Sequence, residues 1–216
     1  MLITLPSGQT ITAEHHPAGA LPEALEGRRW SYIYAPGAGS NINDPFGRFL
    51  CDRLAAAGVD AYRFQFPYME AGRKSPDRAP VLSAAWKSII ETVRPDAQRL
   101  AAGGRSMGGR YASMVAASGA PVEALGLFAY PLHAPGDSRW RDEHFGQIKV
   151  PALFCSGTND AFATPEELKT AAAKLESAQV HLLDRADHGF SVPRASGRTR
   201  QHVYEEAADA LIAWLM

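Results

Sequence analysis

Short apolar runs alternate with longer amphipathic stretches along most of the chain. The short runs have the length of buried strands, and those at residues 30–37 and 59–67 are rich in aromatic and β-branched residues. The short runs cover residues 30–37, 59–67, 100–104, 125–131, 151–157 and 180–184. The run 100–104 is the weakest of these strand predictions, because its alanines favour a helix.

The stretches between these strands repeat apolar residues at helical spacing. Asp44 and Pro45 have the residue types of an N-cap and a first turn, and they precede a helical pattern that extends to Ala57. The other predicted helices cover residues 82–93, 107–118, a segment that starts at Pro165, and 203–214. Strands that alternate with helices indicate βαβ units and a parallel sheet covered on both faces.

The segment from Leu132 to Lys149 interrupts this alternation. Its charged stretch "GDSRWRDEH" predicts a surface excursion, and it is too short to form a separate cap domain. The chain contains no internal repeat, linker or low-complexity segment. We therefore expect one α/β domain over residues 1–216.

Composition and charge narrow the class of protein. Hydrophobic residues make up 46% and charged residues 21% of the chain, which is typical of a globular protein. The net charge of −1 argues against electrostatic attraction to nucleic acid or to anionic membranes. The chain has no signal-peptide pattern at its start and no apolar run near the roughly 18 residues of a membrane span. We expect a cytoplasmic protein.

The two cysteines, Cys51 and Cys155, lie far apart and match no metal-binding or redox spacing. Cys51 falls in a helical pattern and Cys155 in an apolar strand. Both are predicted to be small buried hydrophobic residues, and we expect no metal site.

The pentapeptide Gly104-Arg105-Ser106-Met107-Gly108 matches the G-x-S-x-G pattern. It follows a predicted strand and opens a predicted helix, as a nucleophile elbow requires. The small neighbours allow strand and helix to approach closely, and the turn exposes the serine hydroxyl. A glycine-rich turn with an incidental serine is the alternative.

An attacking serine needs a histidine base, which follows it in the chain order Ser, acid, His. His188 lies in the polar loop "DRADHGF" between the last strand and the last helix, where such a base belongs. His144 lies in the charged excursion, His181 within a strand and His202 within the final helix, so His188 is favoured.

The acid that orients the histidine is expected at the carboxyl edge of the parallel sheet. Asp160 follows the strand 151–157 directly and is favoured. Asp137 follows the preceding strand and is the main alternative. Asp187 adjoins the predicted base, so its side chain is expected to point elsewhere.

A tetrahedral intermediate also needs donors for its oxyanion, generally two backbone N–H groups. Met107, the residue after the nucleophile, is expected to supply one of them. The glycine-bearing loop "YAPGAGS" at residues 34–40 is expected to supply the other, from Ala38 or, as second choice, from Gly39.

From about residue 30 to the C-terminus the chain resembles the α/β-hydrolase superfamily. The resemblance is carried by six segments, in this order: "YAPGAGSN", "FQFPYMEAGRKSPDR", "GGRSMGGR", "YPLHAPG", "SGTNDAF" and "ADHGF". More narrowly, they are similar to small capless predicted hydrolases of the dienelactone-hydrolase-like type, related to a branch with a testis-expressed protein and a subunit of a histone-acetylating complex.

The resemblance implies a three-layer fold with a mostly parallel sheet, helices on both faces and no large cap domain. It also implies Ser106 as nucleophile, Asp160 as acid and His188 as base, without a cofactor. Pro36-Gly37 departs from the His-Gly of many relatives, so a side-chain hydrogen bond that stiffens this loop would be lost. Dienelactone hydrolase itself uses a cysteine nucleophile, so its substrate is not carried over.

Two arginines flank the elbow. Arg110 falls in the first turn of the predicted helix, where a cation opposes the positive end of the helix dipole. A structural ion pair with a carboxylate is favoured there over an anionic ligand, and Arg105 could face either way. An acyl pocket could be lined by residues beside the catalytic loops, namely Tyr68, Met69, Phe162 and Phe190.

The sequence thus predicts a serine hydrolase that cleaves a small carboxylic ester or a related acyl compound. A non-catalytic binding or scaffold protein on the same fold is one alternative, and acyl transfer by the same triad is another. A small acyl compound is the expected partner; the natural substrate and the oligomeric state stay open.

Overall fold

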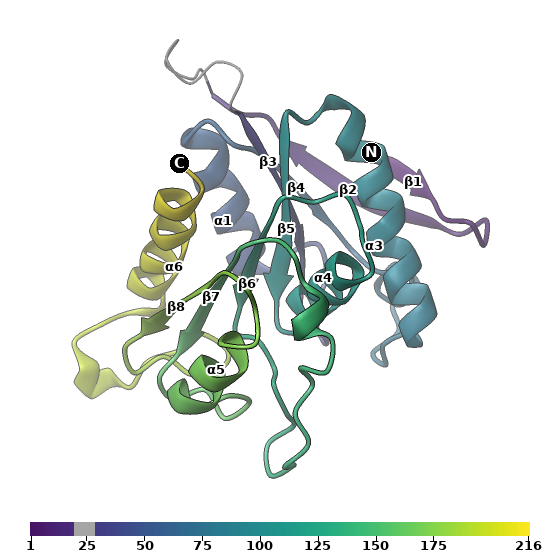
Figure 1. Cartoon of the computed structure of the whole chain (residues 1–216). Helices are drawn as coiled ribbons and strands as arrows, with labels where there is room; N and C mark the ends of the chain where they lie inside the picture. Colours follow the sequence, from purple (N-terminus) through teal and green to yellow (C-terminus); the bar gives the residue numbers. More distant parts are fainter. Residues whose placement is uncertain (20–28) are drawn as a thin grey trace.

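Six parallel strands form the centre of the sheet in the computed structural model, which describes residues 1–19 and 29–216 (Figure 1). Within these ranges the sheet has eight strands in the order β1-β2-β4-β3-β5-β6-β7-β8, with β1 and β2 antiparallel to their neighbours. The strands are β1 (Leu2–Thr4), β2 (Thr10–His16), β3 (Trp30–Ala35), β4 (Asp60–Phe64), β5 (Arg99–Arg105), β6 (Ala124–Phe128), β7 (Ala152–Gly157) and β8 (Ala178–Leu183).

Helices cover both faces of this sheet, and each face has its own apolar core (Figure 1). Helices α1 (Pro45–Ala56) and α6 (Arg200–Leu215) pack on one face, over Tyr32 and Tyr34. Helices α3 (Ala79–Val93), α4 (Met107–Ala117) and α5 (Pro165–Ala172) pack on the other. Shorter elements are α2 (Pro67–Glu70) and the 3₁₀ turns Arg94–Asp96, Phe145–Gln147 and Arg194–Ser196. The predicted three-layer α/β fold without a cap domain is confirmed.

Local sequence signals explain where the helices begin. The Asp44 side chain accepts a hydrogen bond from the Gly47 amide at 3.0 Å, and Pro45 occupies the first turn of α1. Thr164 forms a capping box with Glu167 at the start of α5. These side chains accept hydrogen bonds from amides that the helix itself leaves without partners. The start of α1 predicted from Asp44-Pro45 is confirmed.

The structure differs from the sequence predictions at three places. Strands β1 and β2 were not predicted; β2, "TITAEHH", is largely polar, and it pairs along the edge of the parallel strands. The strand predicted to run to Pro67 ends at Phe64, and Pro67 instead opens the short helix α2. The segment 132–149 is more than a surface excursion, because Leu132, Phe145 and Ile148 are buried in the core.

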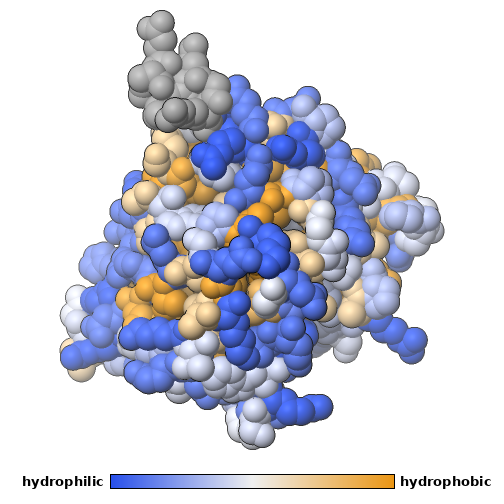
Figure 2. Space-filling model, in the orientation of Figure 1, coloured by the Kyte–Doolittle hydropathy of each residue, from blue (hydrophilic) through white to orange (hydrophobic). Residues whose placement is uncertain are grey.

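Cys51 and Cys155 are free and fully buried, as predicted. Burial raises the pKa of both thiols, which keeps them protonated. On the face drawn in Figure 2, apolar patches are separated by hydrophilic residues. In the ranges that the structure describes, no helix is both long and apolar enough to cross a lipid bilayer.

Candidate active site

Ser106 stands at a strained turn between β5 and α4. Its backbone has φ 52° and ψ −118°, a conformation that side-chain-bearing residues rarely adopt. The other non-glycine residues with positive φ in the described ranges are Ala129, Arg185 and Phe190. All four follow the carboxyl ends of parallel strands, and strain of this kind concentrates at functional sites.

The glycines around Ser106 are required by close backbone contact. A Cβ atom on Gly104 or on Gly108 would lie 2.1 Å from the carbonyl oxygen of Ala35, at the end of β3. A Cβ on Gly109 would lie 2.6 Å from the carbonyl oxygen of Gly104. Strand β5, helix α4 and the end of β3 therefore approach one another more closely than side chains would allow.

Ser106, His188 and Asp160 form one continuous chain of hydrogen bonds. The Ser106 Oγ lies 2.9 Å from the Nε2 of His188, and the His188 Nδ1 lies 2.9 Å from each carboxylate oxygen of Asp160. Asp160 is buried, whereas about a quarter of the His188 side chain is exposed. Of the sequence candidates, the structure brings together these three.

The buried Asp160 carboxylate has further donors. Its Oδ1 accepts from the Phe162 amide at 2.8 Å, and its Oδ2 accepts from the Ser156 hydroxyl at 3.1 Å. The Phe162 ring stacks on the His188 imidazole with a centroid distance of 4.0 Å. The acid and the base are thus held in place from the same short loop.

The loops that carry Asp160 and His188 are joined by backbone hydrogen bonds. The Thr158 amide donates to the Leu183 carbonyl at 3.0 Å, and the Asn159 amide donates to the Ala186 carbonyl at 2.9 Å. A Cβ on Gly157 would lie 1.9 Å from that same Ala186 oxygen, so β7 and the histidine loop meet at a glycine. Residues far apart in sequence are thereby fixed at hydrogen-bonding distance.

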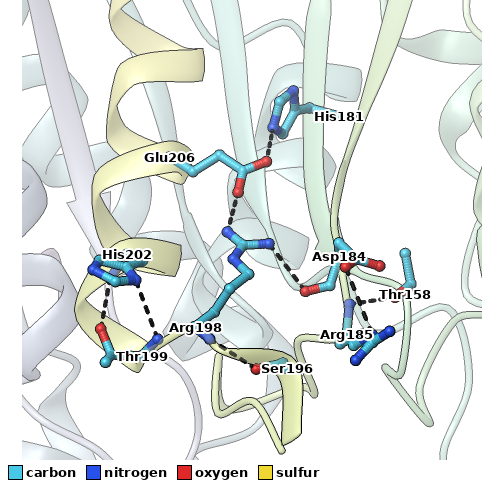
Figure 3. Close-up of polar contacts among 9 residues, drawn as sticks. All are labelled: Thr158, His181, Asp184, Arg185, Ser196, Arg198, Thr199, His202 and Glu206. Atoms are coloured by element: carbon cyan, nitrogen blue, oxygen red, sulfur yellow. Dashed lines mark hydrogen bonds and ion pairs between the residues drawn. The ribbon is translucent and has the colours of Figure 1, made fainter.

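A second set of contacts connects the two ends of the loop that carries His188, between β8 and α6 (Figure 3). Arg198 donates to the Asp184 carbonyl at 3.1 Å and pairs with Glu206 of α6. Glu206 also lies 2.9 Å from the Nε2 of His181 on β8. The loop therefore starts and ends on the same ion-pair cluster, which limits the positions open to His188.

The oxyanion candidates differ in position. Ala38 and Met107 line the cleft beside Ser106, and neither backbone amide donates a hydrogen bond within the described residues. The Ser40 amide closes a turn onto the Gly37 carbonyl at 3.3 Å, and Gly39 is the residue of that turn with φ 76°. Gly39 therefore shapes the turn, while Ala38 and Met107 are the residues that face the cleft.

The cleft has a volume of about 300 Å³. Its wall includes Phe162, as predicted, together with Pro131. The other three pocket predictions are wrong: Tyr68 and Met69 are buried in the core beneath α3, and Phe190 is buried among Phe46 and Tyr204 on the opposite face.

The alternative histidines and acids have other partners. His144 contacts Ser113, His181 contacts Glu206, and His202 belongs to the capping box of α6. Asp137 pairs with Arg139. As expected, Asp187 points away from the base: its carboxylate accepts from the amides of its own loop.

The two arginines that flank Ser106 have different surroundings in the structure. Arg105 pairs with the buried Asp44 at 3.4 Å, so its role is structural. Arg110 has no carboxylate partner among the residues that the structure describes, so the favoured ion pair is wrong. It lines the cleft, as does Arg141, which the sequence analysis missed because it lies within the segment interpreted as a surface excursion.

A strained serine between a parallel strand and a helix, followed by an acid and a histidine from later loops, defines an α/β hydrolase. The chain belongs to the alpha/beta hydrolase domain family, whose model matches residues 28–216. No group of three or more residues suited to hold a metal ion is found in the described part of the chain.

Solved structures agree with this fold. An alpha-beta serine hydrolase homologue from Coxiella burnetii is 18% identical, with a TM-score of 0.75 over 98% of this chain and 96% of that one. A serine hydrolase without a lid from Xanthomonas campestris is 18% identical, with a TM-score of 0.73 over 99% and 93%. A putative dienelactone hydrolase from Klebsiella pneumoniae is 20% identical, with a TM-score of 0.73 over 100% and 97%. The resemblance to capless, dienelactone-hydrolase-like proteins is confirmed, while the link to the testis-expressed branch stays a prediction.

Proposed function

We propose that the protein is a serine hydrolase that cleaves small carboxylic esters or related acyl compounds through an acyl-enzyme. One observation carries this proposal: the hydrogen-bonded chain from Ser106 through His188 to Asp160, which opens into a cleft of about 300 Å³. This volume is at the small end of ligand sites, which favours a small substrate.

In the proposed reaction, the Ser106 Oγ attacks the substrate carbonyl while His188 Nε2 takes the hydroxyl proton. Asp160 accepts the Nδ1–H bond, which fixes the imidazole tautomer and stabilises the imidazolium that forms. His188 then gives its proton to the departing alcohol, and Ser106 keeps the acyl group. In the second half, His188 removes a proton from water as water attacks the acyl carbonyl. The acyl–Oγ bond then breaks, His188 returns the proton to Ser106 Oγ, and the acid product leaves.

The Met107 and Ala38 amides are the proposed oxyanion donors. Both line the cleft next to Ser106, and both are free to donate within the described structure. The start of α4 adds the positive end of the helix dipole at this position. Such fixed donors stabilise the charge that develops on the carbonyl oxygen in the transition state.

The substrate class and cellular place are part of the proposal. No lid covers the cleft in the described residues, so water can reach the acyl-enzyme, which supports hydrolysis over transfer to another acceptor. We propose a cytoplasmic enzyme that needs no cofactor. A scaffold role does not require the Ser106–His188–Asp160 contacts, whereas hydrolysis does.

Covalent labelling tests the proposal. A fluorophosphonate probe should form an adduct on Ser106, located by mass spectrometry, and Ser106→Ala should stay unlabelled. Addition of an alcohol acceptor to an ester assay separates hydrolysis from acyl transfer by the product formed. A folded native protein that neither reacts with the probe nor hydrolyses any ester would support the scaffold alternative.

A further inference from the structure

The wall of the catalytic cleft contains two arginines, Arg110 and Arg141, and no acidic residue among the described lining. They come from different elements: Arg110 from the first turns of α4, and Arg141 from the segment that follows β6. The buried Asp160 stands behind His188 rather than in the wall. The cleft is therefore positively charged beside the serine.

Arg110 is held next to the nucleophile without a counter-ion. Its amide donates to the Ser106 carbonyl at 3.0 Å, and both residues line the same cleft. Its Nε is buried and has no hydrogen-bond partner in the described structure. A cation at the start of a helix also opposes the helix dipole. Among the described residues the Arg110 guanidinium lies 5.6 Å from the centroid of the Tyr111 ring, a cation–π contact, but it has no anionic partner that would offset the unfavourable dipole.

The charge of Arg110 acts on neighbouring groups. Burial, and then the charge of Arg110, lower the pKa of His144 to about 4. Tyr130 is also within reach of this charge, although burial dominates and raises its pKa.

Arg141 likewise makes no ion pair within the described residues. The acid in its vicinity, Asp137, pairs instead with Arg139 at 3.6 Å. Asp142, the next residue in sequence, is buried and bound by Lys174 at 2.7 Å. Asp137 and Asp142 thus each pair with another cation, although Asp137 also lies within electrostatic reach of Arg141. Arg141 lines the cleft.

A buried polar cluster fixes the backbone of both arginines. The Ser113 hydroxyl donates to the Arg110 carbonyl at 2.7 Å, and the Tyr130 hydroxyl donates to the Arg141 carbonyl at 3.2 Å. The two hydroxyls lie 3.3 Å apart, and His144 Nε2 lies 2.8 Å from Ser113. Ser113 and Tyr130 are almost fully buried, so the two arginines are linked through one rigid cluster.

We propose that Arg110 and Arg141 form an anion subsite that binds a carboxylate on the acyl part of the substrate, a few bonds from the carbonyl that Ser106 attacks. Guanidinium groups present paired N–H donors that match the two oxygens of a carboxylate. The substrate class is then a half-ester of a dicarboxylic acid. This inference rests on the proposed hydrolase function and adds the charge of its substrate.

Two matched esters test the subsite: monoethyl glutarate, and ethyl pentanoate, in which a methyl group replaces the carboxylate. Acid release in a pH-stat gives kcat/KM for both. The native protein should prefer monoethyl glutarate, and 0.5 M NaCl should reduce that preference. Arg110→Met and Arg141→Met should each lower the preference ratio roughly 10- to 100-fold, which corresponds to one charged hydrogen bond. Arg110→Lys should lose less than Arg110→Met.

Arg78→Met is the matched control, because the Arg78 side chain is exposed and lies outside the wall of the cleft. It should keep the native ratio. Equal rates for both esters, or the same ratio in all variants, would overturn the subsite and leave the hydrolase proposal intact.

A binding measurement keeps the two proposals separable. Titration calorimetry of monoethyl glutarate with Ser106→Ala needs no turnover. Binding that disappears in the Ser106→Ala/Arg110→Met double variant supports the subsite even if the native protein hydrolyses neither ester. Absence of binding together with absence of turnover would overturn both.

Discussion

Gly108 should be intolerant of any side chain, even a methyl group. A Cβ at this position would lie 2.1 Å from the Ala35 carbonyl oxygen and 2.7 Å from that of Pro36, whereas ordinary contact begins near 3.4 Å. Both obstacles are backbone atoms, so no side-chain rotation relieves the clash. In Gly108→Ala, α4 and the end of β3 must separate by more than an ångström.

The magnitude follows from two opposing effects. Overpacking in a tight core costs about 1–3 kcal/mol. Alanine is the better helix former, which offsets up to about 1 kcal/mol. A net loss of about 1–2 kcal/mol lowers the Tm by roughly 2–8 °C for a chain of this length. Because Pro36 lies two residues before Ala38, the proposed oxyanion donor moves as well, and kcat should fall by about 100-fold.

Thermal unfolding and ester hydrolysis measure the two effects separately. Gly146→Ala is the control, because a Cβ there meets no atom within 4 Å. It should keep both the native Tm and the native kcat. The close-approach reasoning is wrong if Gly108→Ala keeps its Tm within about 1 °C and its kcat within about threefold of the native protein.

Three further substitutions test other parts of the site. Asp160→Asn should lower kcat by about 10³- to 10⁴-fold, because His188 loses the carboxylate that fixes its tautomer; a loss below tenfold would argue against this acid. Arg110→Met should leave the Tm equal or higher in thermal unfolding, since a buried Nε without a partner is removed; a fall of several degrees would contradict this. The pKa of His144 is lowered to about 4, so the unfolded chain binds its proton first and stability falls as pH drops from about 6.5 towards 4. His144→Gln should therefore lose less Tm than the native protein over that interval; equal losses would count against this cause.

Residues predicted at the ends of strands lie together in the structure, because the fold class determines which strand ends meet. The carboxyl ends of parallel strands share one edge of the sheet, so a serine after β5, an acid after β7 and a histidine after β8 converge. The same reasoning separates His188 from His181, which lies within β8 itself.

The direction of a side chain within such a loop could not be predicted in the same way. Phe162 and Phe190 lie two residues after Asp160 and His188, in loops at one edge of the sheet. Phe162 stacks on His188 at the cleft, whereas Phe190, with φ 61°, turns into the core against Phe46. Sequence position places both residues near the site, and the local backbone conformation decides which side of the loop each occupies.

Periodicity and strand–helix alternation were sufficient to predict the α/β class, and together with one glycine-rich turn they indicated Ser106, Asp160 and His188, which the folded chain brings to hydrogen-bonding distance. These features follow from local rules of strand length, helix capping and steric access, which the order of residues expresses directly. The charge of the cleft is different. It depends on whether Arg110 and Arg141 meet a carboxylate, and that is decided by contacts such as Asp137 with Arg139 and Asp142 with Lys174. Pairing between side chains from separate elements is a property of three-dimensional distance, so it emerges only when the chain is folded.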